Sequence, residues 1–263
     1  MKRSTVFRNL CSTVFCFACS SLALQIPSSF GAQPFDVFVR DGDDIAFLTV
    51  SGNSRAQVEG GHVSHLHFRQ AAFGEISGGD QSHVEVHDTA TVSVTGGERS
   101  HFRAYDATQV KVEGGDFGFL TAFDSSRIDI HGGDTSIGVL RARDGGEINL
   151  YEGTVGSVNP FPHGVTNIYG GRFLGRLSLN SDTVTNAYGF DFSLELSGSV
   201  FGTPTYRWKG TLRDGTSVDA EVYLPADAEF NFIVVPEPST TVLIAAATIV
   251  LCLSQSLRQL LPS

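Results

Sequence analysis

Pairs of adjacent glycines recur along this 263-residue chain at intervals of 18 residues. The first five pairs begin at Gly60, Gly78, Gly96, Gly114 and Gly132. After two extra residues, which the spacing assigns to the neighbourhood of Ile137 and Gly138, the series continues at Glu152-Gly153, Gly170-Gly171 and Tyr188-Gly189. Self-similarity at one fixed period predicts a repeat protein, in which each unit is completed by its neighbours.

Apolar residues alternate on both sides of each glycine pair. We number each repeat from the first glycine of its pair, which is offset 0. Offsets −4 and −2 carry Val92/Val94, Val110/Val112 and Ile128/Ile130. Offsets 6 and 8 carry Leu66/Phe68, Val84/Val86 and Leu120/Ala122. Alternation with period two predicts β-strands with one buried face, so even offsets are expected to point inward.

These strands favour an all-β fold in which residues 54–190 form a β-solenoid of 18-residue coils. Coils stacked about 4.8 Å apart would bury a continuous core and pair every backbone ladder. An antiparallel barrel or sandwich also has short alternating strands, but it would not keep particular residue types at a period of 18.

The turns of the repeat have their own signature. We expect the glycine pair to supply backbone angles that other residues resist. Offset 4 holds a small residue in Ser64, Ser82, Ser100, Gly118, Ser136 and Gly156. Offset 10 holds Gln70, Asp88, Asp106, Asp124 and, after the insertion, Asp144. An aspartate followed by Thr or Ser is expected to bond its own backbone in an Asx turn.

Segments with other patterns flank the repeats and are expected to cap the solenoid, whose open ends would otherwise template aggregation. Residues 32–53 are predicted to form N-terminal cap strands. The period fades after Gly171, where Leu177 and Leu179 fall on odd offsets. Residues 191–234 are therefore predicted to form a small β-rich C-terminal cap, which contains Trp208, the single tryptophan.

The first 31 residues are predicted to be a signal peptide, removed by signal peptidase. A basic start is followed by the apolar stretch 14–26, then Pro27 and small residues at Ser29 and Gly31. A retained N-terminal anchor is the alternative. The four cysteines lie in the two terminal apolar segments, so the body between them is predicted to fold without disulfides: Cys11, Cys16, Cys19 and Cys252.

The charge of the body excludes one large class of function. Residues 32–235 hold 14 lysines and arginines against 27 aspartates and glutamates. Nucleic-acid binding requires basic surfaces that displace counterions from phosphate, so no nucleic-acid partner is expected. The acidic balance suits an exported surface and leaves divalent cations open.

One outward ladder is the candidate ligand-facing site. His65, His83 and His101 share offset 5, and Tyr105 lies at offset 9 of the last of these coils. Successive rungs would hold these side chains about 5 Å apart. Imidazoles at that spacing could chelate a metal, but the next rung carries Phe119, and a solvent-facing role is the simpler interpretation. No metal or other cofactor is therefore predicted.

The sequence patterns typical of calcium binding and of catalysis match this chain less well than the pattern of a metal-binding histidine ladder. Calcium-binding β-rolls also use 18 residues per coil, but they carry two glycine-rich ligand motifs per coil, whereas this chain has one glycine pair and its aspartate ten residues later. Glycoside hydrolysis needs one defined pair of carboxylates, which a repeat does not single out. Nucleophile elbows, phosphate loops and cysteine–histidine triads are also missing from the sequence, so we expect no enzymatic activity.

The C-terminal tail resembles a sorting signal. A proline-rich hexapeptide precedes a short apolar run, 242–253, which is brief for a transmembrane helix, and a basic residue follows: Val235, Pro236, Glu237, Pro238, Ser239, Thr240 and Arg258. Residues 235–263 are thereby similar to the PEP-CTERM signal of bacterial exported proteins. The resemblance implies recognition by an exosortase, a membrane-embedded cysteine peptidase, and delivery to the cell surface or an exopolysaccharide matrix. The repeats and the cap are also similar to the bodies of planctomycete exported proteins.

Two functions remain in view. The first is a structural or adhesive protein, exported and transiently inserted in the inner membrane by its tail. The alternative is a solenoid that binds or cleaves extracellular polysaccharide. A groove with two converging carboxylates would favour cleavage, whereas a uniformly striped surface would favour the structural role.

Overall fold

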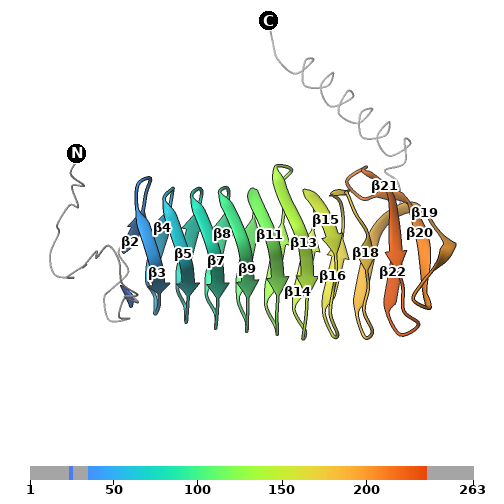
Figure 1. Ribbon diagram of the computed structural model, residues 1–263, viewed down its shortest axis with the longest axis horizontal. Helices are drawn as coiled ribbons and strands as arrows, with labels where there is room; N and C mark the ends of the chain where they lie inside the picture. Colours follow the sequence, from blue (N-terminus) through green and yellow to red (C-terminus); the bar gives the residue numbers. More distant parts are fainter. Residues whose placement is uncertain (1–23, 26–34, 236–263) are drawn as a thin grey trace, which may run out of the picture.

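The computed structural model describes residues 24–25 and 35–235, and every regular element within them is a β-strand. Most of this part of the chain forms a β-solenoid of about eight coils. Figure 1 shows the coils side by side in one row, with the N-terminal coil at one end and strands β19 to β22 gathered at the other. The predicted solenoid is therefore confirmed.

Each coil contributes a short strand and a long strand. The short strands are β2 (Val37–Val39), β4 (Arg55–Val58), β6 (Phe73–Ile76), β8 (Thr91–Val94), β10 (Gln109–Val112), β12 (Arg127–Ile130), β14 (Glu147–Leu150) and β16 (Val165–Ile168). The long strands are β3 (Asp44–Val50), β5 (His62–Phe68), β7 (Asp80–Val86), β9 (Glu98–Ala104), β11 (Gly115–Ala122), β13 (Thr135–Ala142) and β15 (Thr154–Val158). Strands of one kind pair in parallel from coil to coil, with partners 18 residues apart in most pairs, as in Val92 with Val110, and 19 or 20 apart in the others.

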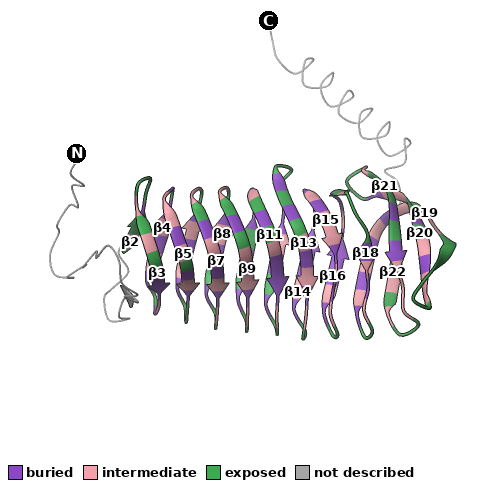
Figure 2. Cartoon of the chain, viewed as in Figure 1, coloured by how far each residue is buried: buried purple, intermediate pink, exposed green. Residues whose placement is uncertain are grey.

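The core lies inside the coils. The alternating apolar positions of the short strands, such as Val92, Val94, Val110 and Val112, are at most 2% exposed. Figure 2 shows buried and exposed residues alternating along successive strands. Inward-pointing side chains of each coil thus pack on those of the next, and the stack buries what a single coil would leave open to water.

The rule that even offsets point inward is wrong in the first half of the long strands. Offset 3 is buried, as in Val63 and Phe117, whereas the acidic residues at offset 2, such as Asp80, are exposed. The pairing of β5 with β7 skips offset 4, since Val63 pairs with Gln81 and His65 with His83. The chain turns a corner there, so offsets 4 and 5 both lie on the outside and the alternation changes phase.

The small residues predicted at offset 4 line this corner, but the predicted alignment assigned Ser136 to this column by mistake. Phe117 pairs with Ile137, so Gly118 aligns with Gly138 rather than with Ser136. Because Gly115 already pairs with Thr135, the two extra residues lie at the Gly133–Asp134 turn and not near Ile137. A Cβ atom on Gly138 would lie 2.7 Å from the carbonyl oxygen of Gly118, which explains why only small residues fit where coils approach so closely.

The prediction for the glycine pairs, that they supply backbone angles other residues resist, holds for the second glycine of the pair but not for the first. The second glycine has a left-handed backbone in most coils, with φ of 82° at Gly79 and 91° at Gly97. A Cβ atom on the first glycine would collide with the previous coil, at 2.3 Å from the Glu59 carbonyl oxygen for Gly78. The two glycines are therefore required for different reasons, one for its angles and one for its size.

The aspartates at offset 10 do not form Asx turns. They adopt left-handed angles, with φ of 62° at Asp88 and 56° at Asp106. The carboxylates of Asp88, Asp106 and Asp124 instead accept a hydrogen bond from the coil before: the N–H of Gln70 donates to Asp88 Oδ2 at 2.8 Å, and the N–H of Asp88 to Asp106 Oδ2 at 2.9 Å. Aspartate tolerates the left-handed region better than most residues, and stacking supplies a donor nearer than its own backbone.

The predicted N-terminal cap is part of the solenoid. β2 pairs in parallel with β4, and β3 pairs with both β5 and β1 (Leu24–Gln25). Val39, Leu48 and Val50 join the core with no exposed surface. The strands assigned to a cap at residues 32–53 therefore form the first coil, because their apolar positions fall in register with the repeats that follow.

The C-terminal segment changes from parallel coils to antiparallel strands. The last coil includes β17 (Arg172–Phe173) and β18 (Leu177–Ser178), where Leu177 pairs with Val158, 19 residues earlier, which accounts for its odd offset. β19 (Val184–Val200), β20 (Thr203–Leu212) and β21 (Ser217–Tyr223) pair antiparallel, and β22 (Glu229–Val234) returns beside the start of β19. Trp208 is fully buried against Phe173, Phe192 and Phe230.

The terminal predictions fall mostly outside the described residues. The signal peptide over residues 1–31 overlaps them only at β1, and the apolar run 242–253 does not overlap them. A helix long and apolar enough to cross a membrane is not found among residues 24–25 and 35–235.

The inward register predicts a large cost for one substitution. Val112→Asp would bury an unpaired carboxylate between Val94 and Ile130, and we expect it to lower the free energy of unfolding by several kcal/mol. Gln109→Asp, on the exposed side of the same strand, is the matched control and should unfold within about 0.5 kcal/mol of the wild type. Urea denaturation measures both. Equal stability of Val112→Asp and the control would contradict the register.

The aspartate ladder predicts a graded series at Asp106. Asp106→Ala loses the acceptor and places alanine in the left-handed region, and we expect a loss of about 1–2 kcal/mol. Asp106→Asn keeps an acceptor oxygen and tolerates the angle, so it should lose less. Asp106→Gly relieves the angle but removes the acceptor and should fall between them in urea denaturation. An alanine variant as stable as the asparagine variant would show that the inter-coil bond contributes nothing.

Candidate ligand-facing surface

Three columns of outward side chains cover the second half of the long strands, and together they form the face that holds the predicted site residues. The histidine column, at offset 5, consists of Phe47, His65, His83, His101 and Phe119. The charged column, at offset 7, consists of His67, Glu85, Arg103, Thr121 and Arg141. The tyrosine column, at offset 9, consists of Arg69, His87, Tyr105, Phe123, Arg143 and Phe161.

The histidine column is a continuous stack of rings. The centroids of His65 and His83 are 5.0 Å apart and those of His83 and His101 are 4.9 Å apart, with planes within 6° of parallel. Phe119 extends the stack beyond His101 at 4.9 Å. The predicted ladder spacing is therefore found, and Phe119 continues the stack as its last ring, because Val139 follows on the next rung.

Tyr105 belongs to a separate stack. Its ring lies 4.6 Å from both His87 and Phe123, and the planes are within 13° of parallel. Burial, followed by the charge of Glu85, raises the pKa of Tyr105, so its phenol stays protonated at neutral pH. The charged column separates Tyr105 from the three predicted histidines, so the four residues line one face without meeting at one point.

Stacking decides what the face can offer a ligand. Neighbouring rings of a column cover each other's faces, so their edges point toward solvent. A sugar ring that packs on an aromatic residue needs an open ring face, and these columns present few. The groups left for a ligand are ring edges, the Tyr105 hydroxyl and the guanidinium groups of the arginines.

Glu85 organises the first half of the face. Its Oε1 atom lies 3.2 Å from Arg103 Nη1. Its Oε2 atom lies 3.3 Å from His87 Nε2 and 3.7 Å from His67 Nε2. Burial alone would raise the pKa of Glu85, but the hydrogen bonds from His87 and Arg103 and the charge of His67 hold it below its ordinary value. Glu85 is therefore an ionised acceptor that is already occupied by three neighbours.

The stacked histidines are poor bases. Burial, the adjacent imidazole and Arg103 lower the pKa of both His83 and His101. Their Nδ1 atoms are buried without a hydrogen-bond partner among the described residues. In the same part of the chain, three or more histidine, cysteine or carboxylate side chains nowhere converge as metal ligands do.

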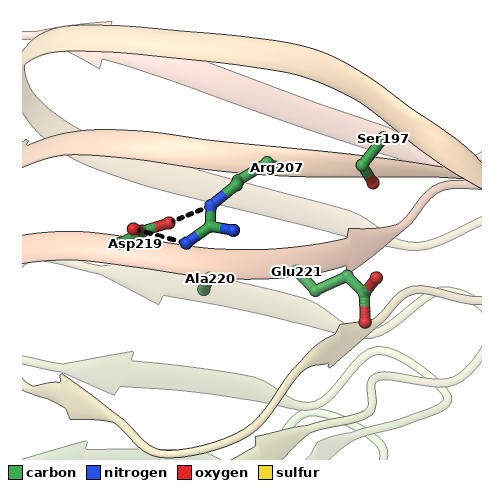
Figure 3. Close-up of a pocket in the computed structure, with 5 residues that line it drawn as sticks. All are labelled: Ser197, Arg207, Asp219, Ala220 and Glu221. Carbon is green, nitrogen blue, oxygen red and sulfur yellow. Dashed lines mark hydrogen bonds and ion pairs between the residues drawn. The ribbon is translucent and has the colours of Figure 1, made fainter.

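A second candidate lies on the cap, in a shallow pocket lined by Ser197, Arg207, Asp219, Ala220 and Glu221 (Figure 3). Arg207 holds Asp219 through two bonds, Nε to Oδ1 at 2.6 Å and Nη2 to Oδ2 at 2.7 Å. This hydrogen bonding to Arg207 lowers the pKa of Asp219. Figure 3 shows the Glu221 carboxylate pointing away from Asp219, so the two acidic groups do not converge on one point as paired glycosidase carboxylates would.

Two ladders on the short-strand side were missed by sequence reasoning. The amides of Asn149, Asn167 and Asn186 are joined through Nδ2–Oδ1 bonds of 2.8 Å, and the rings of Tyr151, Tyr169 and Tyr188 stack 4.7 and 4.2 Å apart. Burial, reinforced by the neighbouring tyrosines, raises the pKa of Tyr169 to about 12. Recurrence of one residue type at intervals of 18 or 19 was the available signal.

Two polar side chains at offset 3 point into the core and were also missed. Gln81 is fully buried and Arg99 is 3% exposed. Arg99 donates to the carbonyl oxygens of Gly97 and Gly96 at 3.2 and 2.5 Å, and burial lowers the pKa of its guanidinium to about 10. These groups satisfy the glycine corner from inside, so they are structural rather than available to a ligand.

Comparison with protein-family models, curated proteins and solved structures finds no match for this chain. Of the sorting-motif residues, Val235 lies at the end of the described chain, where its N–H donates to the Gly189 carbonyl at 2.9 Å. The others lie outside the described residues: Pro236, Glu237, Pro238, Ser239, Thr240 and Arg258.

The histidine column predicts a loss of stability in acid. Because His83 and His101 have lowered pKa values in the fold, the unfolded chain binds protons more readily. Their contribution is therefore complete above the ordinary pKa of about 6.5 and is lost as the pH falls below it. The double variant His83→Phe/His101→Phe continues the stack as Phe119 does, and it should lose less stability than the wild type between pH 7.5 and pH 5.

Urea denaturation at several pH values measures this difference. His163→Gln is the matched control, because His163 is exposed in a turn and has a left-handed backbone, a conformation that glutamine also adopts at Gln70. The control should keep the wild-type pH profile. A double phenylalanine variant with the wild-type profile would exclude the stacked histidines as the cause.

Proposed function

We propose that this chain is an exported, non-enzymatic structural or adhesive protein, sorted by an exosortase to the cell surface or the exopolysaccharide matrix. The observation that carries the proposal is the striped outer face, in which the same columns continue from coil to coil. A ligand site of an enzyme is usually a single concave place with convergent polar groups. A surface that repeats along a rod suits contact with an extended partner or with many copies of one group.

The physical character of the body supports an extracellular role. It has no cysteine between residues 32 and 235, so its stability does not depend on the redox state of its surroundings. Its excess of 13 negative charges favours solubility outside the cell. The stacked backbone ladders supply rigidity in place of disulfides.

The end of the fold is compatible with a sorting signal. β22 pairs with β19 up to Val234, and the proline-rich hexapeptide begins one residue later. Proline fixes its own backbone angle and restricts the residue before it, so Pro236 and Pro238 would keep this stretch extended and separate from a following helix. An extended segment beside the membrane is what a peptidase could bind.

The alternative function, binding of extracellular polysaccharide, has its own support in the arginines of the outer face. Cleavage of polysaccharide is not part of the proposal. In the cap pocket Asp219 is held ionised by Arg207, and Glu221 has no opposing acid that could serve as its catalytic partner.

Processing of the tail is the test. We expect the mature protein from the native host to lack the residues beyond about Pro238. Replacing Pro236, Glu237 and Pro238 with alanine should let the following helix extend and trap an unprocessed, membrane-bound form. Glu229→Ala, which removes one exposed charge from the cap, is the control and should be processed normally.

Mass spectrometry of membrane and surface fractions measures the C-terminus directly. A surface form that is intact through Ser263 would mean that the segment is an ordinary anchor, and the sorting proposal would then be wrong.

A further inference from the structure

We infer that the arginine end of the outer face binds the carboxylate groups of a linear anionic polysaccharide. The site consists of Arg141 and Arg143 with Arg103 two coils away. The inference deepens the proposed function and rests on it for its biological setting, because it names the class of matrix polymer that the face would contact.

Arg141 is the centre of the site. Its Cζ atom lies 4.8 Å from the ring centroid of Phe119 and 5.8 Å from that of Phe161. Among the described residues it has neither a hydrogen bond nor an ion pair, and its Nε atom is buried without a partner. The rings hold the guanidinium in place by cation–π contact and leave its N–H groups without acceptors, which is the state of a preorganised donor.

Arg143 adds a second guanidinium to the same rung. Its Cζ atom lies 4.6 Å from the Phe161 ring and 5.2 Å from the Phe123 ring. Its acidic neighbour, Asp144, approaches Nε only to 3.7 Å, which is beyond a good hydrogen bond. Phe161 therefore contacts both arginines, and the two guanidinium groups lie close to one ring.

Arg103 extends the site along the rod. It pairs in register with Thr121, and Thr121 pairs with Arg141, so the two arginines stand two rungs apart, about 10 Å. Arg103 is bonded to Glu85 and is held in position by it. Arg103 and Arg141 thus place positive charges along the solenoid axis at a multiple of the rung spacing. This arrangement suits a polymer with regularly placed anions better than a single small ion.

The chemistry favours carboxylates on a polysaccharide. The planar guanidinium forms two parallel bonds to a carboxylate, and it keeps its charge at every physiological pH. Tyr105, stacked between His87 and Phe123, lies on the same face, where its hydroxyl can bond to sugar hydroxyls. Nucleic acid is a disfavoured ligand, because binding it requires many positive charges that neutralise phosphates. This site offers three arginines on a body that carries 13 excess negative charges.

Binding of the full chain, purified in mild detergent, to polygalacturonate tests the inference. Methyl-esterified polygalacturonate, dextran sulfate and double-stranded DNA are the comparison probes. We expect the double variant Arg141→Gln/Arg143→Gln to bind polygalacturonate at least about tenfold more weakly than the wild type. The methyl ester should bind weakly to both proteins, because it lacks the charge. Arg141→Lys keeps the charge but loses the planar fork and should fall between them.

Arg127→Gln is the matched control. Arg127 is exposed and, unlike Arg141, paired with carboxylates, and it lies on β12 among the short strands. Its loss should leave the affinity for polygalacturonate unchanged, and thermal unfolding of each variant checks that the fold is intact. Equal losses in the control and the double variant, absence of wild-type binding, or equally tight arginine-dependent binding of dextran sulfate or DNA would each overturn the inference.

This test and the test of the tail can fail separately. Polymer binding is measured with purified protein, whereas processing is measured in the native host. A chain that binds polygalacturonate but keeps Ser263 would retain the binding site and lose the sorting proposal.

Discussion

The structure depends on one interaction, the parallel pairing of each coil with the next in constant register. A shift by one residue would turn every inward side chain of a strand outward, so the register is protected by the whole core at once. Once it is set, equal positions of successive coils lie one rung apart. That single constraint produces every ladder of the structure: the stacked histidines, the stacked tyrosines, the bonded asparagine amides and the aspartates that bond the previous coil.

The corners are where this constraint is relaxed. The coils turn at a corner that usually holds a glycine pair, at a column of small residues, and at a left-handed residue that is most often aspartate. Each corner solves a different steric problem. The two extra residues at Gly133–Asp134 fall at such a corner, so the strands on either side keep their pairing. At the C-terminal end β19 leaves the coil and the antiparallel cap closes the stack, with Trp208 filling the space beneath it.

The same stacking shapes what the outer face can bind. Neighbouring aromatic rings cover one another's faces, so few ring faces are open for a sugar ring to pack on. Hydroxyls, ring edges and guanidinium groups remain available to a ligand. Arg141, held between Phe119 and Phe161 with unused donors, is then the group with the most binding capacity left to it. The proposed role, display in an extracellular layer, would use the cationic stretch of this acidic rod to contact a matrix polymer.

The sequence alone determined the 18-residue coil, the buried positions such as Val92 and Val110, and the left-handed turn at the second glycine of most pairs, because these follow from period-two alternation and a repeated local turn. It also indicated the spacing of His65, His83 and His101. Only the tertiary structure decided that Asp88 bonds the previous coil, that Arg99 points inward, and that Arg141 meets Phe119 and Phe161. The physical reason is that these contacts join residues of different coils, so they depend on how the chain rotates at each corner, and one skipped position at offset 4 changes which side chains face water.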